Sequence, residues 1–443
     1  MTEEVRHEVA VLRPVPRIIP RSEHNISRSQ ISDNALKVLY RLSNAGFQSY
    51  LVGGSVRDLL LGREPKDFDV VTDALPEQVR ELFRNSRVIG RRFRLVHVRY
   101  GEEIIEVSTF RAAHHVADAE GEGHIIEGRI IRDNVYGSLD DDVWRRDLTV
   151  NALFYNIDDF TVIDYVGGLQ DIRAGRIRLI GEPHTRYIED PVRLLRVVRF
   201  AVKLGFRIEP GTEAPIEELS HLLGKIPPAR LFEEVPKLFL GGYALQSFEM
   251  LRHYGLFARL FPQTEAALAE EEGGFPHTVL IHALNNADSR LAENKPVTPG
   301  FLFAALLWTP MQSLARENIA KGLGESEAID LASDVVISRQ IASTALPRRF
   351  TNMAREIWQM QPRLTSHTRR QPARLLASPR FRSAYDFLLL RAAAGEDVAE
   401  AADWWTRLQE DVAQPDPVAP PAGTRRRRRR GRRKQGSHPP LEP

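Results

Sequence analysis

Two aspartates, Asp67 and Asp69, stand one residue apart at the start of the apolar run Phe68–Val71. Side chains of a strand alternate between its two faces, so both carboxylates are expected to point the same way. Two acids aimed at one point repel each other, and a cation between them relieves that repulsion. Mg²⁺ is the expected ion because it takes oxygen ligands, commonly one or two carboxylates with substrate phosphates. Two such ions, with Mn²⁺ as a substitute, can hold the attacking and leaving oxygens of a phosphoryl displacement.

A glycine pair, Gly53-Gly54, lies between the expected strand Tyr50–Val52 and the expected helix Ser55–Leu61. Such a turn lets backbone N–H groups and the N-terminus of the helix face a phosphate, and Arg57 in the first helical turn can add positive charge. A glycine pair alone is typical of any tight turn, and neither the G-x-x-x-x-G-K nor the G-x-G-x-x-G spacing occurs here. Its combination with the acid pair, after one short helix, indicates a nucleotide site.

Three stretches of the chain carry a family resemblance. GGSVRDLLLG followed by DFD resembles the head of the nucleotidyltransferase superfamily shared by bacterial poly(A) polymerases and tRNA CCA-adding enzymes, of the class II type. RRDLTVNAL (145–153) and EDPVRLLRVVRF (189–200) resemble the next two motifs of that family, in the right order. ISDNALKVLYRL (31–42), GRRFRLVHV (90–98) and a basic C-terminal tail resemble the bacterial poly(A) polymerases in particular.

The second motif adds two adjacent arginines and an acid, Arg145, Arg146 and Asp147. The arginines can hold a triphosphate while the acid joins the metal carboxylates, although an exposed ion pair of Arg146 with Asp147 gives the same pattern. The resemblance favours the functional interpretation. Glu106, in an expected strand over 102–111, can face the same site if that strand lies beside the acid pair. The sequence does not decide whether Glu106 or Asp147 is the more important third acid.

The third motif begins a helix expected over 189–206, with Asp190 as its N-cap. An aspartate oxygen can accept a hydrogen bond from an exocyclic amino group while Arg193 donates to the adjacent ring nitrogen. The resemblance implies that the family reads its incoming base in this way. Adenine and cytosine both offer that pair of groups, so Asp190 and Arg193 alone do not distinguish ATP from CTP. Arg196, one helical turn further on, is also assigned to the nucleotide.

The length of 443 residues predicts more than one domain. The expected fold class is an α+β head with a mixed nucleotidyltransferase-type sheet, followed by an all-α neck, body and leg. The expected segments are an irregular arm (1–25), the catalytic head (26–180), a helical neck for nucleotide and RNA binding (181–260), a helical RNA-binding body (261–412) and a disordered basic tail (413–443).

Composition points to the compartment and the partners. The chain has no cysteine and no apolar run of about 18 residues, and its N-terminus lacks an apolar signal core, which predicts a cytoplasmic protein without a transmembrane segment. Its formal net charge is +2, but residues 425–434 read RRRRRRGRRK, and without residues 425–443 the rest of the chain carries about −6. A polybasic tail suggests a polyanion partner, and proteins of RNA decay are further candidate partners.

Together these features predict template-independent polyadenylation of RNA 3′ ends with ATP, releasing pyrophosphate by two-metal phosphoryl transfer, with a role in RNA processing and decay. In this reading Asp67 and Asp69 hold the metal ions and Asp147 completes the catalytic set. The nucleotide is bound by residues of all three motifs: Gly53, Gly54, Arg57, Arg146, Asp190, Arg193 and Arg196. A CCA-adding enzyme with the same head, or an RNA-binding protein on an inactive transferase scaffold, are the rival hypotheses.

Overall fold

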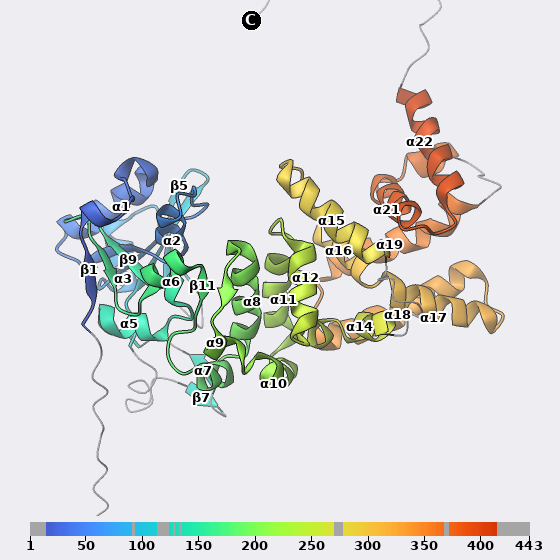
Figure 1. Cartoon of the computed structure of the whole chain (residues 1–443). Helices are drawn as coiled ribbons and strands as arrows, with labels where there is room; N and C mark the ends of the chain where they lie inside the picture. Colours follow the sequence, from blue (N-terminus) through green and yellow to red (C-terminus); the bar gives the residue numbers. More distant parts are fainter. Residues whose placement is uncertain are drawn as a thin grey trace, which may run out of the picture.

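The computed structural model describes residues 15–90, 94–112, 124–126, 129–132, 135–269, 278–366 and 372–413. In it an α+β head is followed by a long row of helices, and Figure 1 shows the two parts side by side, joined through α8. This confirms the predicted fold class. Among the described residues, no helix combines the length and the apolar character needed to span a bilayer. The predicted basic tail lies outside the described residues.

The head is built on a mixed sheet of eight strands in the order β1-β10-β9-β2-β3-β6-β5-β4. The strands are β1 (Arg17–Ile19), β2 (Ser49–Val52), β3 (Asp69–Thr72), β4 (Ser86–Ile89), β5 (Leu95–Tyr100), β6 (Glu103–Thr109), β9 (Leu153–Asn156) and β10 (Val162–Asp164). β3 lies inside the sheet, antiparallel to β2 and parallel to β6. Its register sets Val52, Asp69 and Glu106 side by side on three neighbouring strands.

Helices and short turns surround this sheet and carry much of the site. They are α1 (Asp33–Asn44), α2 (Gly54–Leu60), α3 (Pro76–Leu82), α5 (Leu139–Arg145), α6 (Gly168–Ala174) and the 3₁₀ turns η1 (Arg21–Glu23), η2 (Arg28–Gln30) and η3 (Thr149–Asn151). A separate hairpin joins β7 (His124–Ile126) and β8 (Arg129–Arg132). The stripe of α1 that faces the core recurs at helical spacing, as Ala35, Val38, Leu39 and Leu42, all buried.

The N-terminal arm differs from its prediction. Residues 17–19 were expected to be irregular, but they form the edge strand β1, which pairs antiparallel with β10. Ile19 is fully buried in the head core, and so is Ile26 further along the arm. A strand of three residues is too short to show the alternation by which strands are recognised in a sequence.

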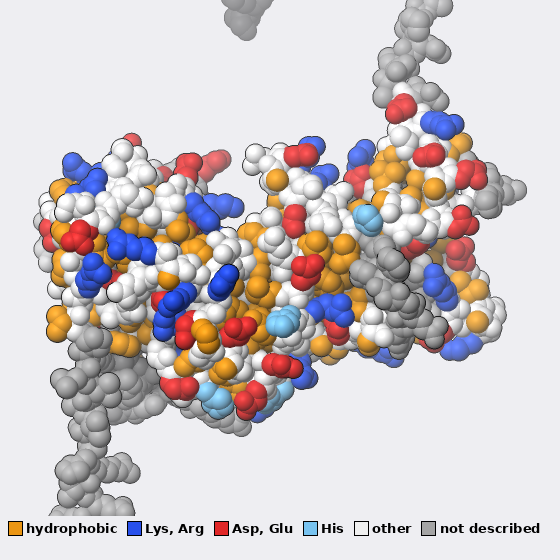
Figure 2. All heavy atoms as spheres, in the orientation of Figure 1, with side chains coloured by type: hydrophobic (Ala, Val, Ile, Leu, Met, Phe, Trp, Pro, Cys, Tyr) orange, Lys and Arg blue, Asp and Glu red, His pale blue; other side chains and the backbone are white. Residues whose placement is uncertain are grey.

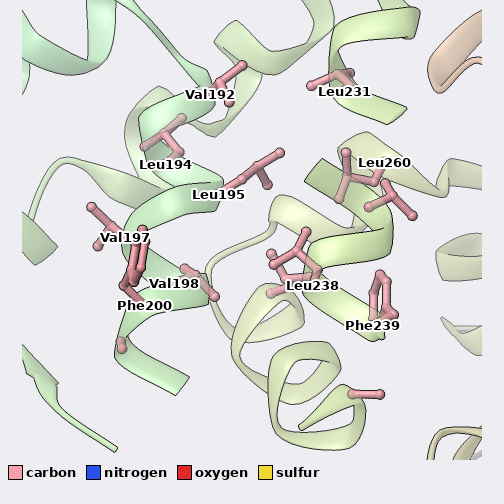
Figure 3. Packing of buried hydrophobic residues seen from close by; sticks show 14 of the residues in the cluster. Val192, Leu194, Leu195, Val197, Val198, Phe200, Leu231, Leu238, Phe239 and Leu260 are labelled. Atoms are coloured by element: carbon pink, nitrogen blue, oxygen red, sulfur yellow. The ribbon is translucent and has the colours of Figure 1, made fainter. Parts of the chain in front are cut away.

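The neck is organised around α8 (Val192–Leu204), which follows α7 (Pro183–Glu189). Figure 3 shows its side chains Leu195 and Val198 directed towards Leu231 and Leu238 of α11 (Pro228–Phe239), and all four are buried. A parallel pair of two-residue strands, β11 (Arg176–Ile177) and β12 (Arg207–Ile208), joins the end of the head to the segment after α8. The head and neck are therefore joined by strand pairing as well as by the chain that runs between them.

The remaining helices form the body and leg. They are α9 (Pro210–Glu213), α10 (Ile216–Leu219), η4 (Ser220–Lys225), α12 (Ala244–His253), α13 (Leu256–Leu260), α14 (Pro262–Ala269), α15 (Thr278–Ala292), α16 (Pro299–Leu306), α17 (Trp308–Ala320), α18 (Glu325–Ser343), α19 (Arg348–Thr365), α20 (Pro372–Leu376), α21 (Phe381–Ala393) and α22 (Ala399–Ala413). One large apolar core runs from the head through the neck into the body, and a smaller core joins the end of α19 to α21 and α22.

Candidate active site

The predicted acid pair lies where β3 begins. Asp69 is the first residue of that strand, and Asp67 is an exposed residue of the loop before it. Glu106 of β6 is the register partner of Asp69, so both side chains stand on the same face of the sheet. The Glu106 carboxylate also lies 3.1 Å from Nε2 of His97 on β5. The sheet thus places Glu106 beside the acid pair, which the sequence analysis expected if the two strands were neighbours.

Burial and neighbouring charges act strongly on Asp69. Burial raises the pKa of its carboxyl to about 6, with Glu106 and Asp67 acting in the same direction and Arg146 opposing them. A divalent cation would remove this repulsion, so the acid pair suits one. Within the part of the chain that the structure describes, no three acidic, histidine or cysteine side chains converge closely enough to hold a metal ion by themselves. Substrate phosphates and water would supply the other ligands.

The raised pKa of Asp69 predicts how the metal-free protein responds to pH. The folded state disfavours the ionised carboxylate, so its stability is lost as pH rises from the ordinary value of 3.8 through about 6. We expect Asp69→Asn, measured with chelator present, to raise the free energy of unfolding at pH 8 by up to about 3 kcal/mol. Near pH 4 the two proteins should unfold at the same temperature. A variant less stable than the parent at pH 8 would contradict the assignment.

The glycine turn packs directly against these groups. Gly53 has φ 75° and ψ −131°, a conformation that residues with a Cβ rarely adopt. A Cβ placed there would lie 3.9 Å from both Oδ2 of Asp69 and Nη1 of Arg146. α2 begins at Gly54, so its N-terminal end also opens beside the acids. The turn therefore lets backbone approach the acid pair closely, as a phosphate-binding turn requires.

Arg57 lies deeper than the sequence predicted. Its side chain is 2% exposed and pairs with Asp58 at 2.7 Å. Nη1 donates to Oδ1 of Asn151 at 2.5 Å, and the guanidinium lies 5.3 Å from the ring centroid of Phe200 on α8. These contacts hold α2 against η3 and the neck. Arg57 thus braces the glycine turn, with its Nη2 3.6 Å from where a Cβ of Gly54 would lie, and its contact with a phosphate stays a prediction.

Arg146 stands beside the glycine turn, close enough to Asp69 to lower its pKa. Nε and Nη2 both donate to Oδ2 of Asp142, at 3.0 and 2.8 Å, and the guanidinium lies 5.1 Å from the centroid of the Phe154 ring. The side chain is 21% exposed. It is therefore aimed by fixed partners while part of it still faces the site, which suits a group that holds a phosphate.

Further arginines gather behind Arg146, and two of them, Arg111 and Arg186, had not been assigned by the sequence analysis. Burial lowers the pKa of Arg145 to about 8, helped by the charges of Arg111, Arg146, Arg186 and Arg193. Burial likewise lowers the pKa of Arg186, to about 10. So many cations in a half-buried region create a strong positive potential, which favours an anionic ligand. Arg145 and Arg146 lie in the RRD motif and Arg193 in the third motif, whereas Arg111 and Arg186 come from other parts of the chain.

Asp147 is paired with the neck. Its Oδ2 accepts a short hydrogen bond from Nε of Arg196, and its Oδ1 accepts from the backbone N–H of Leu148 at 2.8 Å. Burial opposes ionisation of this acid, but the charge and hydrogen bond of Arg196 outweigh it and hold the pKa of Asp147 well below its usual range. The structure thus pairs Asp147 with Arg196, two residues that the sequence analysis had placed in the site.

The predicted base readers stand at the junction of α7 and α8. The prediction that Asp190 is the N-cap of the neck helix is wrong: Pro191 is the N-cap of α8, which begins at Val192, and Asp190 ends α7. One oxygen of Asp190 accepts from the backbone N–H of Val192 at 3.3 Å. Its other oxygen accepts from Nη2 of Arg230 on α11 at 2.5 Å. Arg193 donates to Glu189 at 2.9 Å and to the backbone carbonyl of Arg186 at 2.7 Å. Arg230 was not recognised because nothing in its local sequence marks it.

Comparisons with known proteins show the family of this chain. Three family models match the chain: "Poly A polymerase head domain" over residues 49–178, "Probable RNA and SrmB- binding site of polymerase A" over 205–268, and "Polymerase A arginine-rich C-terminus" over 321–435. The first spans the glycine turn, the acid pair and the RRD motif. The third reaches into the polybasic stretch.

Two curated relatives resemble nearly the whole chain. Poly(A) polymerase I of Escherichia coli O6:H1 is 48% identical over 94% of this chain and 90% of that protein, and poly(A) polymerase I of Haemophilus influenzae is 45% identical over 88% of each. The CCA-adding enzyme of Lactobacillus helveticus is 39% identical, over 49% of this chain and 52% of that protein.

A solved structure supports the fold over most of its length. The Bacillus stearothermophilus CCA-adding enzyme in complex with CTP has a TM-score of 0.55 and 26% identity, covering 85% of this chain and 82% of that one. The extent of the sequence similarity distinguishes the two kinds of relative: it spans both parts of the molecule for the poly(A) polymerases and about half of it for the CCA-adding enzyme. The chain therefore belongs to the bacterial poly(A) polymerase family, within the nucleotidyltransferase superfamily.

Proposed function

We propose that this protein extends RNA 3′ ends with AMP from ATP, without a template, and releases pyrophosphate. The observation that carries the proposal is the contact between the acid pair and the glycine turn: Asp69 lies against Gly53, with Arg146 on the same side. Acids that bind a cation and a turn that admits a phosphate are the two parts that nucleotidyl transfer needs in one place. The family relationship supports the same reaction.

In the proposed reaction the RNA 3′-oxygen bonds to the α-phosphorus of ATP while the bond from that phosphorus to pyrophosphate breaks. Asp67 and Asp69, with Glu106 beside them, would hold Mg²⁺, which when bound lowers the pKa of the attacking hydroxyl and stabilises charge on the leaving group. Gly53 and Gly54 let the triphosphate approach the acids, and Arg146 orients it. The protein itself contributes mainly position and charge.

Asp147 has a different part in this proposal. Glu106 is the closer candidate for a third carboxylate because it is the register partner of Asp69. Asp147 and Arg196 form an ion pair between the head and the neck, which fixes the neck helix behind the nucleotide. Both residues then act through the position of α8, on which Arg193 stands.

Base selection is proposed to depend on how rigidly Asp190 and Arg193 are held. Each has a fixed partner, Arg230 and Glu189 respectively, and Arg230 belongs to α11 of the next part of the molecule. A rigid donor–acceptor pair can fit one ring edge better than another, because adenine and cytosine place the matching atoms differently in the site. Loss of either partner would let Asp190 and Arg193 adapt to both adenine and cytosine.

Arg230→Ala tests this. Freed from Nη2 of Arg230, the Asp190 carboxylate should move enough to accept cytosine, and we expect the ratio of kcat/KM for ATP over CTP to fall about tenfold, which corresponds to about 1.4 kcal/mol. The exposed Arg259→Ala is the matched control and should leave the ratio unchanged. An Arg230→Ala enzyme that loses activity equally with both nucleotides would show that the contact is only structural.

The proposal is separated from its main alternative by primer extension with each of the four NTPs and one short single-stranded RNA. The alternative, CCA addition, is favoured by the fold likeness to the CCA-adding enzyme bound to CTP. Long ladders with ATP alone support polyadenylation. Addition of a few residues with CTP accepted, or efficient C incorporation into a tRNA lacking its 3′ end, would support the alternative.

The proposed place of this reaction is RNA processing and decay, since an added 3′ tail gives other RNA enzymes a single-stranded end. The polybasic stretch at residues 425–434 would raise affinity for any RNA without choosing sequence, because phosphate contacts carry no base information. It is also the proposed attachment point for protein partners.

A further inference from the structure

Three polar side chains lie in one row across the head sheet, on the face that carries the acid pair. The register sets His97 of β5 opposite Glu106 of β6, and Glu106 beside Asp69 of β3. Register partners point to the same face of a sheet, and neighbouring strands are about 4.8 Å apart. The polar row therefore continues beyond the acids to a histidine that the proposed reaction does not use.

His97 contacts Glu106 directly. Its Nε2 lies 3.1 Å from Oε1 of the carboxylate. An ionised carboxylate only accepts hydrogen bonds, so the ring nitrogen is the donor of this pair. A bond to one oxygen fixes the orientation of a carboxylate and keeps its second oxygen open to a cation. The contact therefore suits an acid that is held ready for a metal ion.

The position of His97 is itself fixed by the fold. Its strand, β5, is paired on both sides, with β4 and with β6. Its neighbours along the strand, Val96 and Val98, point to the opposite face and are buried in the large apolar core. The side chain of Glu106 is 50% exposed, and that of His97 is 27% exposed. A long, exposed acidic side chain is thus anchored to a ring that the sheet keeps in place.

An exposed ion pair is not by itself a sign of function. Charged side chains of both signs are spread over the surface of the head and of the helical part in Figure 2. Pairs as exposed as His97 and Glu106 contribute little to folding stability. The neighbour of this pair sets it apart. After burial, the charge of Glu106 is the next cause of the raised pKa of Asp69, so the two carboxylates act on the same place.

We propose that His97 is a positioning residue of the metal site, which holds the Glu106 carboxylate beside the acid pair so that all three acids share a Mg²⁺ ion. This role rests on the proposed function, which assigns the acids to a cation. His97 does not bind the cation itself, because its Nε2 is taken up by Glu106. Loss of such a hydrogen-bond partner typically weakens metal affinity or activity by about 10–100-fold.

Binding of Mn²⁺ to the full-length protein, followed through the EPR signal of the free ion, measures the site without any reaction. The relevant binding is the part that Asp69→Asn removes. We expect His97→Leu to raise the Kd for Mn²⁺ at this site about tenfold or more. His97→Gln should recover most of the affinity, because its amide N–H can replace the ring N–H.

Primer extension with ATP gives a second readout, the concentration of free Mg²⁺ at which the rate is half maximal. For His97→Leu this concentration should rise by the same factor as the Kd for Mn²⁺. At saturating Mg²⁺ its kcat should return close to the parental value, since the added ion compensates for the weaker site. Its unfolding temperature should also match that of the parent, because so exposed a pair adds little stability.

Two controls separate positioning from a general effect. His221→Leu removes an exposed ring of η4, whose Nδ1 lies 2.8 Å from the backbone carbonyl of Glu218, and should leave both readouts unchanged. In the Glu106→Gln background, His97→Leu should add no further loss of Mn²⁺ affinity, because the histidine acts only through that carboxylate.

Equal Mn²⁺ affinities of His97→Leu and the parent would overturn the proposal, and so would an added loss in the Glu106→Gln background. A fall in kcat that saturating Mg²⁺ does not relieve would show a structural role instead. A parent protein without a Mn²⁺ site would overturn the proposal together with the cation role of the acid pair. A parent that binds Mn²⁺ but extends no RNA would remove the proposed function and leave the role of His97 in the metal site standing.

Discussion

Asp69→Asn is expected to abolish polyadenylation, lowering kcat by about 10³-fold or more. The substitution keeps the shape of the side chain but removes the charge that a cation needs, and a lost metal ion withdraws several kcal/mol of transition-state stabilisation, each 1.36 kcal/mol being a factor of ten. Binding of RNA should be preserved, because a carboxylate such as Asp69 is not needed to bind the phosphates of the RNA. Primer extension with ATP and Mg²⁺ gives the rate, and fluorescence anisotropy gives the affinity for RNA.

Asp73→Asn is the control for this experiment. Asp73 follows the same strand, β3, but its side chain is exposed. The control should extend RNA at the parental rate. An Asp69→Asn enzyme that kept more than a tenth of the parental kcat would remove the acid pair from the mechanism. A variant that lost RNA binding to the same extent would point to a folding defect instead.

Arg196→Ala is expected to have the largest effect on stability. Removing the guanidinium leaves the Asp147 carboxylate, 13% exposed, without the partner that holds its pKa down. Breaking a buried ion pair in this way costs about 3–5 kcal/mol. Because the native pKa of Asp147 is depressed, the stability from the pair is present above its usual range and is lost as pH falls through and below that range. The loss should therefore be largest at pH 7, smaller but still present near pH 3, and should disappear only in stronger acid.

Thermal unfolding at the two pH values measures this, with Arg259→Ala as an exposed control expected to change stability by no more than about 0.5 kcal/mol. The double variant Asp147→Asn/Arg196→Gln should recover part of the loss, since replacing both members of a buried pair is far less costly than removing one. If Asp147→Asn alone lowered kcat as much as Asp69→Asn does, without loss of stability, Asp147 would have to be counted among the metal carboxylates.

The sequence revealed those parts of the site that depend on local spacing. Asp69 begins a strand, Asp67 lies in the loop just before it, and Gly53 precedes a helix, so their neighbours along the chain decide their geometry. The position of Glu106 needed one further fact, the parallel pairing of β6 with β3. The alternation of Glu106 with apolar neighbours predicted on which side of its strand it lies. Which residue it meets there depends on the order of strands in the sheet.

Contacts between distant segments could not be predicted in this way. Asp190 and Arg230 are 40 residues apart, and nothing in the segment around Arg230 distinguishes it from an ordinary helix surface. Arg57 was expected at the triphosphate because its motif places it in the first turn of a helix. Its burial depends on Asn151 and on the ring of Phe200, which come from the next two motifs. Tertiary packing thus decides how deeply Arg57 is buried, which its place in the motif did not predict.

The interlocking of head and neck has a consequence for how such enzymes can be recombined. The strands β11 and β12 pair at Arg176 and Arg207, which lie before and after α8 in the sequence. Asp147 of the head forms an ion pair with Arg196, and Arg199 forms one with Glu234 of α11. A chimaera that exchanged heads with a CCA-adding relative at residue 180 would sever the first two of these contacts. Crossovers placed after α11 would keep all three within one parent, so functional hybrids should arise from exchange of the later helices.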